Sequence, residues 1–181
     1  QLFEGSAQWS DFMPWYFIPK SMLITIPLVV LAGFIILFFF IKKICWSGRG
    51  LLFSFLLISL FFPLVFVISI KSNVYSSWRQ FLFLYPVIIM LSASGIIYLL
   101  EVLKNRYMKF ALAGIIVFLA YHPVRFSVSN HPYEYIYYNQ LTGGLKGAYG
   151  NYETDYYYTG QTEASEWLIN YLKEKDIDSA L

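Results

Sequence analysis

The sequence predicts an all-α polytopic membrane protein: a bundle of about four transmembrane helices, followed by a tyrosine-rich extracytoplasmic segment that begins an α/β-type domain. Hydrophobic residues make up 58% of the 181-residue chain, whereas charged residues make up 13%, about half of their share in soluble domains. Long uncharged runs alternate with short polar loops, and aromatic residues make up 21% of the chain. Together these observations favour a membrane protein over a soluble one.

Residues 1–20 are expected to form an outer interfacial segment. Within it, "WSDFMPWYFIPK" (9–20) contains five aromatic residues, two prolines and one lysine. Aromatic side chains gather at the headgroup level of membranes, so this stretch is predicted to lie along the interface. Two interpretations stay open: a plain aromatic anchor, or a segment in which Lys20 faces a lipid headgroup or a phosphate.

Residues 21–124 are predicted to be the transmembrane region. A helix needs about 20 apolar residues to cross the hydrocarbon core. Three uncharged runs have this length: 22–41, 51–70 and 81–100. A shorter run at 110–121 reaches it if the helix begins near Tyr107 and ends near Val124. Pro27, Pro63 and Pro86 lie inside the first three runs, so we expect kinked helices packed in a bundle.

The predicted spans lack charged residues, and the basic residues elsewhere are dispersed. The four uncharged runs contain no Asp, Glu, Lys, Arg or His, apart from His122 at the edge of the last. Ion pathways and proton relays usually need charge inside the membrane, so a permease is disfavoured and the chemistry is expected at the membrane surface. A net charge of +2 with dispersed basic residues disfavours a nucleic-acid partner. Cys45, the single cysteine, excludes an internal disulfide.

Basic residues near the spans predict the orientation. Lys42, Lys43, Arg49, Lys104, Arg106 and Lys109 lie on one side, and Lys20, Lys71, Arg79 and Arg125 on the other. The positive-inside rule places the side with six basic residues in the cytoplasm. The aromatic residues Trp9, Trp15, Tyr16, Tyr75 and Trp78 gather on the opposite side. Both terminal segments are therefore predicted to face the periplasm, the cell exterior or an organelle lumen.

Trp78 and Arg79 lie at the outer end of the third predicted span, in "WRQFLFLYP". A guanidinium can bind phosphate oxygens through two parallel hydrogen bonds, and a phosphate-bearing lipid is its natural partner at a membrane surface. The alternative is that Arg79 extends to ordinary lipid headgroups.

Residues 125–181 are predicted to be an extracytoplasmic tail. Nine tyrosines fall between His131 and Tyr158. They can stack on sugars or pack against the bundle, and the pattern of residues favours neither interpretation. Residues 133–138 ("YEYIYY") allow a strand, but tyrosines would lie on both faces. Apolar residues spaced as in a helix begin at Ala164, with Thr162 as a possible N-cap, and "KEKDIDSAL" (173–181) is typical of the approach to a strand.

Other candidate groups in the tail carry weaker signals. His122 and His131 both precede a proline, but their separation has no metal-ligand spacing, so metal binding is disfavoured while a divalent cation stays possible. Glu134, Glu153 and Asp155 are candidate acids or bases, although carboxylates in an acidic tail are usually solvated.

Three stretches resemble the C-terminal half of bacterial family-39 glycosyltransferases: "PWYFIPKSMLITIPL", "WRQFLFLYP" and "HPYEYIYYNQLTGGLKGAYGNYETDYYYTGQTEASEWL". These polytopic enzymes belong to the GT-C superfamily, together with protein O-mannosyltransferases and the lipid A aminoarabinose transferase. The resemblance covers nearly the whole chain. It implies that a sugar moves from a polyprenyl-phosphate carrier to an acceptor at the outer face of a membrane, here expected to be a bacterial inner membrane.

The resemblance also bears on individual residues. The family's catalytic acidic residues lie in a first outer loop that this chain does not contain, so no catalytic role passes to Glu4 or Asp11. We expect the chain to be a piece of a longer protein. The predicted partners are the polyprenyl-phosphate-sugar donor, membrane lipids and an unidentified acceptor. The predicted substrate-binding residues are Arg79 first and Lys20 second, with Trp78, Tyr85, His131, Tyr133 and Glu134. A non-catalytic scaffold with a glycan- or partner-binding tail is the alternative.

Overall fold

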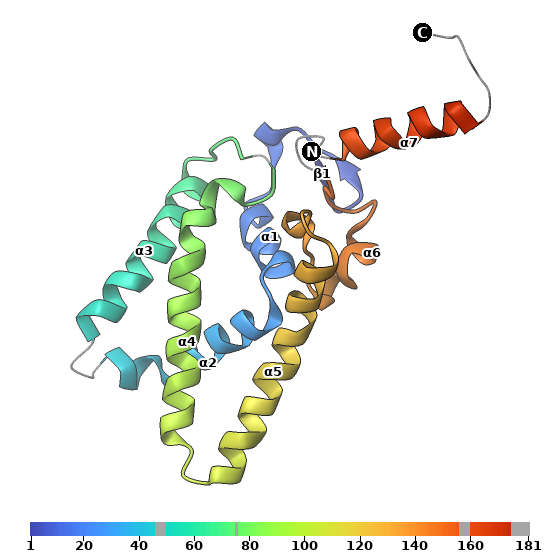
Figure 1. The fold of residues 1–181 in the computed structure, drawn as a ribbon. Coiled ribbons are helices and arrows are strands. Elements are labelled where there is room, and N and C mark those ends of the chain that lie inside the picture. The colour runs from blue at the N-terminus through green and yellow to red at the C-terminus, as the bar shows by residue number, and fades with distance from the viewer. Residues whose placement is uncertain (46–49, 75, 156–159, 175–181) are drawn as a thin grey trace.

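The computed structural model describes residues 1–45, 50–74, 76–155 and 160–174, which fold into seven α-helices, four 3₁₀ helices and one two-stranded hairpin (Figure 1). The helices are α1 (Phe17–Thr25), α2 (Leu28–Cys45), α3 (Gly50–Ser69), α4 (Tyr85–Val102), α5 (Arg106–Ser129), α6 (Gly144–Ala148) and α7 (Gln161–Glu174). The 3₁₀ helices are η1 (Ser10–Phe12), η2 (Arg79–Leu84), η3 (Glu134–Ile136) and η4 (Gln140–Thr142). The hairpin pairs β1 (Leu2–Phe3) with β2 (Ser6–Ala7).

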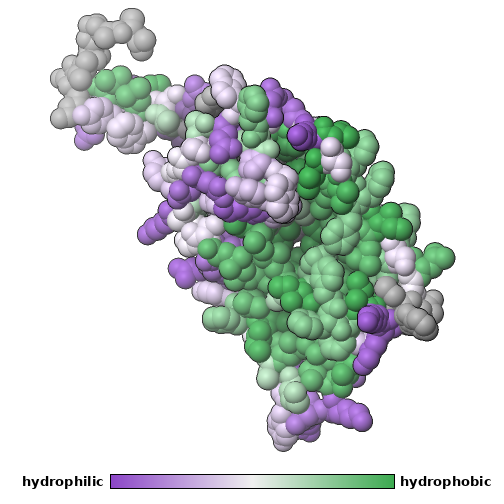
Figure 2. Space-filling model, turned by 180° about the vertical axis from the view of Figure 1, so that it is seen from behind, coloured by the Kyte–Doolittle hydropathy of each residue, from purple (hydrophilic) through white to green (hydrophobic). Residues whose placement is uncertain are grey.

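The length and composition of the helices support the predicted membrane character of the chain. Three helical stretches are long and apolar enough to cross a membrane: α3, η2 continued by α4, and α5. The bent pair α1 and α2 is a fourth if it is counted as one span. Figure 2 shows a broad apolar surface between two polar ends. We call the end that carries the hairpin and the tail the upper end, and the end with the α4–α5 loop the lower end (Figure 1).

The helices α2 and α4 form the centre of the bundle, and small residues let them pack closely. A Cβ atom on Gly33 would lie 2.2 Å from the Ser92 hydroxyl oxygen, and one on Gly95 would lie 2.4 Å from the Gly33 carbonyl oxygen. Leu37 and Leu91 are fully buried beside this crossing. Membrane helices associate largely through such close packing, because lipid tails remove the usual hydrophobic driving force.

The first predicted span, 22–41, is not one helix, and this corrects the prediction. The helix α1 ends at Thr25, α2 begins at Leu28, and their axes differ by 117°. Proline lacks an N–H and disfavours the helical conformation in the residue before it. Accordingly, Ile26 is extended, with φ −75° and ψ 133°, directly before Pro27. A kinked helix was expected, but the structure has two separate helices at this point.

The tail residue Asn139 satisfies the polar groups that this break exposes. Its side-chain amide donates to the carbonyl oxygens of Leu23 and Ile26, each at 2.7 Å. Its backbone N–H donates to the Ile24 carbonyl oxygen at 2.8 Å. Asn139 has no exposed surface. Buried carbonyl groups need hydrogen-bond donors. The interruption between α1 and α2 is therefore stabilised by a residue of the distant tail.

The other spans agree with the prediction more closely. Pro63 lies inside α3 as expected. Pro86 instead occupies the first turn of α4, after η2, so the expected mid-helix kink at Pro86 is wrong. Proline is favoured in a first helical turn because its missing N–H would have no intrahelical partner there. The helix α5 extends to Ser129, beyond the predicted end near Val124, with Pro123 inside it.

The N-terminal hairpin meets the tail at the upper end. Phe3 is 1% exposed and forms a β-bridge with Tyr152. The turn between β1 and β2 uses Glu4 and Gly5, both with positive φ, and the Gly5 N–H donates to the Asn151 carbonyl oxygen at 3.1 Å. The N-terminal segment is thus more than a surface anchor, since its hairpin packs on the tail.

The tail is helical where the sequence left a choice. The possible strand at 133–138 contains the 3₁₀ helix η3 instead. Thr162 is the second residue of α7, so its predicted role as N-cap is wrong. Trp167 and Tyr171 stack on one face of α7, as the helical spacing predicts, with ring centroids 5.3 Å apart. Arg49, Tyr75 and the predicted approach to a strand beyond Glu174 lie outside the described residues.

Candidate functional site

Arg79 lies in a cavity of about 320 Å³ at the upper end of the bundle, which we call the Arg79 pocket. Four parts of the chain form it: the break between α1 and α2, the start of the η2–α4 span, the upper turns of α5, and the tail around η3. Its walls include Thr25, Pro27, Trp78, Arg79, Tyr85, Pro123, Ser127, Glu134, Tyr135 and Tyr137. Four predicted site residues, namely Trp78, Arg79, Tyr85 and Glu134, therefore come together.

Trp78 lines this pocket and also connects two of the segments that form it. The side chain is 7% exposed, and its indole N–H donates to the Thr25 hydroxyl at 2.6 Å. That hydroxyl donates in turn to the Ser21 carbonyl oxygen at 2.7 Å. The ring meets Tyr85 edge-on, with centroids 5.9 Å apart. The chain of hydrogen bonds fixes the end of α1 against η2.

The Arg79 guanidinium lies over the ring of Tyr135, with Cζ 5.3 Å from the ring centroid. Stacking on an aromatic face orients a guanidinium while its N–H donors point outward in its own plane. Ser76 and Ser77, just before Trp78, both have positive φ, at 56° and 61°. Consecutive serines in this sparsely populated region indicate a loop held in place by its surroundings, as is common near functional sites.

The pocket contains a hydroxyl with no partner among the described residues. The Tyr137 hydroxyl is buried and makes no hydrogen bond there. Burial, helped by the neighbouring Tyr85, raises the pKa of Tyr137 to about 12, so the hydroxyl stays protonated and neutral. An unpaired buried hydroxyl costs about 1–3 kcal/mol. A ligand acceptor that reached this hydroxyl would remove this cost.

Glu134 and His131 form a pair at the rim of the pocket. Glu134 Oε1 and His131 Nδ1 lie 2.5 Å apart. The hydrogen bond from His131 lowers the pKa of Glu134, which keeps the carboxylate ionised. His131 does not line the cavity, and its side chain is 77% exposed. Within the described ranges, no group of three or more His, Cys, Asp or Glu side chains is placed to hold a metal ion.

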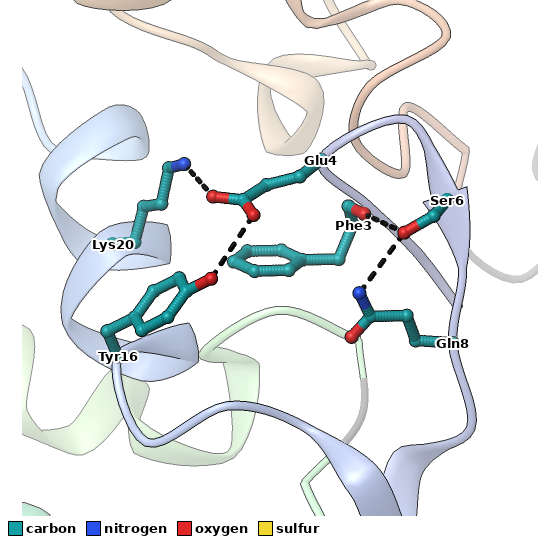
Figure 3. A network of polar contacts seen from close by, with 6 residues as sticks. All are labelled: Phe3, Glu4, Ser6, Gln8, Tyr16 and Lys20. Carbon is teal, nitrogen blue, oxygen red and sulfur yellow. Dashed lines mark hydrogen bonds and ion pairs between the residues drawn. The ribbon is translucent and has the colours of Figure 1, made fainter.

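The two other predicted residues, Lys20 and Tyr133, lie outside the pocket. Lys20 forms an ion pair with Glu4, whose carboxylate also accepts from the Tyr16 hydroxyl at 3.2 Å (Figure 3). It thereby fastens the hairpin to α1. Tyr133 hydrogen-bonds Glu163 at the start of α7, and this contact raises the pKa of Tyr133 to about 12. Neither side chain is placed with Arg79 to bind one phosphate.

A second, apolar cavity lies beyond the break, and we call it the apolar groove. It has a volume of about 690 Å³ and is lined by α1, α2 and α3, with Ile88 of α4 and Leu119 of α5. Thr25 and Pro27 line the Arg79 pocket, whereas Ile26 and Leu28 line the apolar groove. The broken segment thus lies between a pocket that contains charged side chains and an apolar groove.

Some residues of this arrangement could not be identified from the sequence. Tyr135 and Tyr137 belong to a run in which many tyrosines look alike. Asn139 lies between Tyr138 and Gln140, and only its distant partners reveal its role.

Comparisons of this chain with known protein families, with curated proteins and with solved structures find no match. The geometry of the pocket and the groove is therefore the basis for a functional assignment.

Proposed function

We propose that this chain is the C-terminal half of an integral-membrane glycosyltransferase of the family-39 type, which moves a sugar from a polyprenyl-phosphate carrier to an acceptor at the outer face of the membrane. One observation carries the proposal: the Arg79 pocket and the apolar groove lie on opposite sides of the same two-residue break. A polyprenyl-phosphate sugar has a polar, anionic head and a long apolar tail, and each part matches one cavity.

The chemistry of the pocket suits the leaving group. Negative charge develops on the carrier phosphate as the sugar departs. A fixed guanidinium in a partly dry site stabilises such charge more strongly than in water. Arg79 supplies this cation, oriented by Tyr135. Tyr137 adds a neutral donor, which would gain the partner that its hydroxyl lacks among the described residues.

Other residues have supporting roles in this proposal. Glu134 stays ionised beside His131, so it can orient sugar hydroxyls as an acceptor. We assign no catalytic base to this chain, since the resemblance implies that the catalytic carboxylates come from an outer loop nearer the N-terminus of the whole protein. The acceptor is unidentified.

The proposed orientation places the upper end outside the cytoplasm. The lower loop region carries Lys104, Arg106 and Lys109, which the positive-inside rule assigns to the cytoplasm. The Arg79 pocket lies at the opposite end, where a carrier lipid flipped to the outer leaflet would present its phosphate.

Transfer of a radiolabelled sugar from a polyprenyl-phosphate donor, measured with the full-length protein in membranes, tests the proposal. Arg79→Ala should lower turnover about 100-fold or more, as expected for loss of a charge-stabilising donor. The turnover of Arg79→Lys should lie between those of the wild type and Arg79→Ala, because lysine keeps the charge but cannot form two parallel hydrogen bonds. Lys104→Ala, at the lower end, is the control. Equal transfer by Arg79→Ala at matched expression refutes the assignment, and no transfer by the wild type favours the scaffold alternative.

A further inference from the structure

A separate cavity of about 360 Å³ lies between the N-terminal segment and the upper end of α3, and we call it the Lys71 cavity. Residues 10–15, with Phe17 and Ile18, form one side, and Val67, Ile68, Lys71, Ser72 and Val74 form the other. It shares no lining residue with the Arg79 pocket, and with the apolar groove it shares Ile68 alone. Its role can therefore be considered independently of sugar transfer.

Two opposite charges line this cavity without neutralising each other. Lys71 and Asp11 are both exposed, and no ion pair joins them to each other or to another described residue. One oxygen of Asp11, Oδ1, accepts a hydrogen bond from the Asn73 side-chain amide at 2.6 Å, which fixes the carboxylate at the rim. A cation and an anion held apart at one cavity match a ligand that carries both charges.

Lys71 lies just beyond the end of α3 and has an unusual backbone conformation. Its φ is 48°, in the left-handed region that glycine adopts more readily. The Ser72 N–H donates back to the Val67 carbonyl oxygen at 3.1 Å and closes the helix end. A lysine at this position brings a positive charge to the cavity rim that glycine would not supply.

The surroundings of the cavity are those of a membrane interface. Its floor is apolar, with Phe17 and Ile18 almost completely buried. Trp9 and Phe12 are each 81% exposed and Trp15 is 72% exposed, and the last two line the cavity. Exposed tryptophans of this kind belong at the headgroup level of a bilayer. Below the rim, Val65, Phe66 and Ile70 of the α3 end present apolar surface where acyl chains would lie.

We propose that the Lys71 cavity binds the headgroup of a phospholipid with a primary ammonium group, of the phosphatidylethanolamine type. The phosphate meets Lys71, and the ammonium donates hydrogen bonds to Asp11. A choline headgroup has no N–H to donate to the carboxylate. A glycerol headgroup has hydroxyl donors but no positive charge to offset the Asp11 carboxylate. The bound lipid would hold the aromatic N-terminal segment at the membrane surface.

Native mass spectrometry of the delipidated full-length protein in detergent tests this proposal, with ethanolamine, choline and glycerol phospholipids of identical acyl chains as probes. We expect the ethanolamine lipid to bind about tenfold more tightly than the other two, as one charge-assisted hydrogen bond allows. Lys71→Gln should weaken its binding by a similar factor. Asp11→Asn should remove the preference among the three lipids while leaving binding to the phosphate intact.

Lys104→Gln removes a cation at the lower end and should leave binding unchanged. Both rim positions are exposed, so thermal unfolding of Asp11→Asn and Lys71→Gln should match the wild type. Equal affinity of the glycerol lipid, or a preference that survives Asp11→Asn, overturns the proposal. So does wild-type binding that Lys71→Gln does not weaken.

Discussion

Asn139 donates its side-chain amide to the Ile26 carbonyl oxygen at 2.7 Å, across 113 positions of the sequence. The contact is completely buried. It joins the tail to the point where the first predicted span breaks, and the broken segment separates the Arg79 pocket from the apolar groove. The shape of the candidate site therefore depends on a residue that touches neither the proposed phosphate nor the lipid tail.

Removing this amide should destabilise the protein strongly. Asn139→Ala leaves the buried Ile26 carbonyl and the partly buried Leu23 carbonyl without their side-chain donor, and an unpaired buried group costs about 1–3 kcal/mol. We expect a loss of about 2–4 kcal/mol in the free energy of unfolding, measured in detergent. Asn130→Ala removes a similar amide bond at the end of α5 and is the control, with a much smaller loss expected. An unchanged unfolding midpoint for Asn139→Ala would contradict the proposed role.

The crossing of α2 and α4 should not tolerate an added methyl group. Gly33→Ala places a Cβ against Ser92, at a distance of 2.2 Å before any relaxation. Overpacking of this kind costs about 1–3 kcal/mol. Gly114→Ala is a matched control in α5, where no atom lies within 4 Å of the added Cβ. Thermal unfolding of both variants measures the difference, and equal midpoints would show that the helices can move apart freely.

The ion pair between Glu4 and Lys20 should make the attachment of the hairpin sensitive to acid. The hydrogen bond from Lys20 lowers the pKa of Glu4 below its ordinary value of 4.5. The stabilisation is therefore fully present above pH 4.5 and is lost as the pH falls through the lower folded value. Limited proteolysis of residues 1–8 should speed up below that pH. Glu4→Gln should be cleaved faster at neutral pH and show little change with acid, and an acid response equal to that of the wild type would argue against this ion pair as the cause.

Tyr137→Phe should separate stability from function. Removing a buried hydroxyl that has no partner among the described residues should leave the free energy of unfolding unchanged or raise it by about 1 kcal/mol. Sugar transfer, or affinity for a polyprenyl phosphate, should fall about tenfold, as for loss of one hydrogen bond to a charged group. Tyr149→Phe alters a tyrosine that is 77% exposed and should change neither measurement. A Tyr137→Phe protein that is fully active and less stable would assign the hydroxyl a structural role instead.

The general class of the fold could be read from the sequence, because membrane crossing depends on local composition. The spans at 51–70 and 81–100 correspond closely to α3 and to η2 with α4. The apolar face of α7 also followed from the spacing of Trp167 and Tyr171. These features need no knowledge of distant partners.

The break at Pro27 and the pocket beside it could not be predicted in the same way. A proline in a span allows a kink or a break, and the choice depended on whether a donor such as Asn139 was available. Tyr135 and Tyr137 reach the pocket through the 3₁₀ turn of η3. The pattern of apolar and polar residues did not predict this turn. Lys20 looked available for a phosphate because its partner, Glu4, lies in a short segment with no clear pattern of its own.

The contact between Asn139 and the broken segment also imposes an order on biosynthesis. Translation proceeds from the N-terminus, so Leu23 and Ile26 enter the membrane environment long before the ribosome reaches position 139. Until then, their carbonyl groups lack the donor that the finished protein provides, and backbone groups in that environment do not stay unpaired without cost. The arrangement at this break can therefore form only after residue 139 has been synthesised, so this corner of the molecule is completed late.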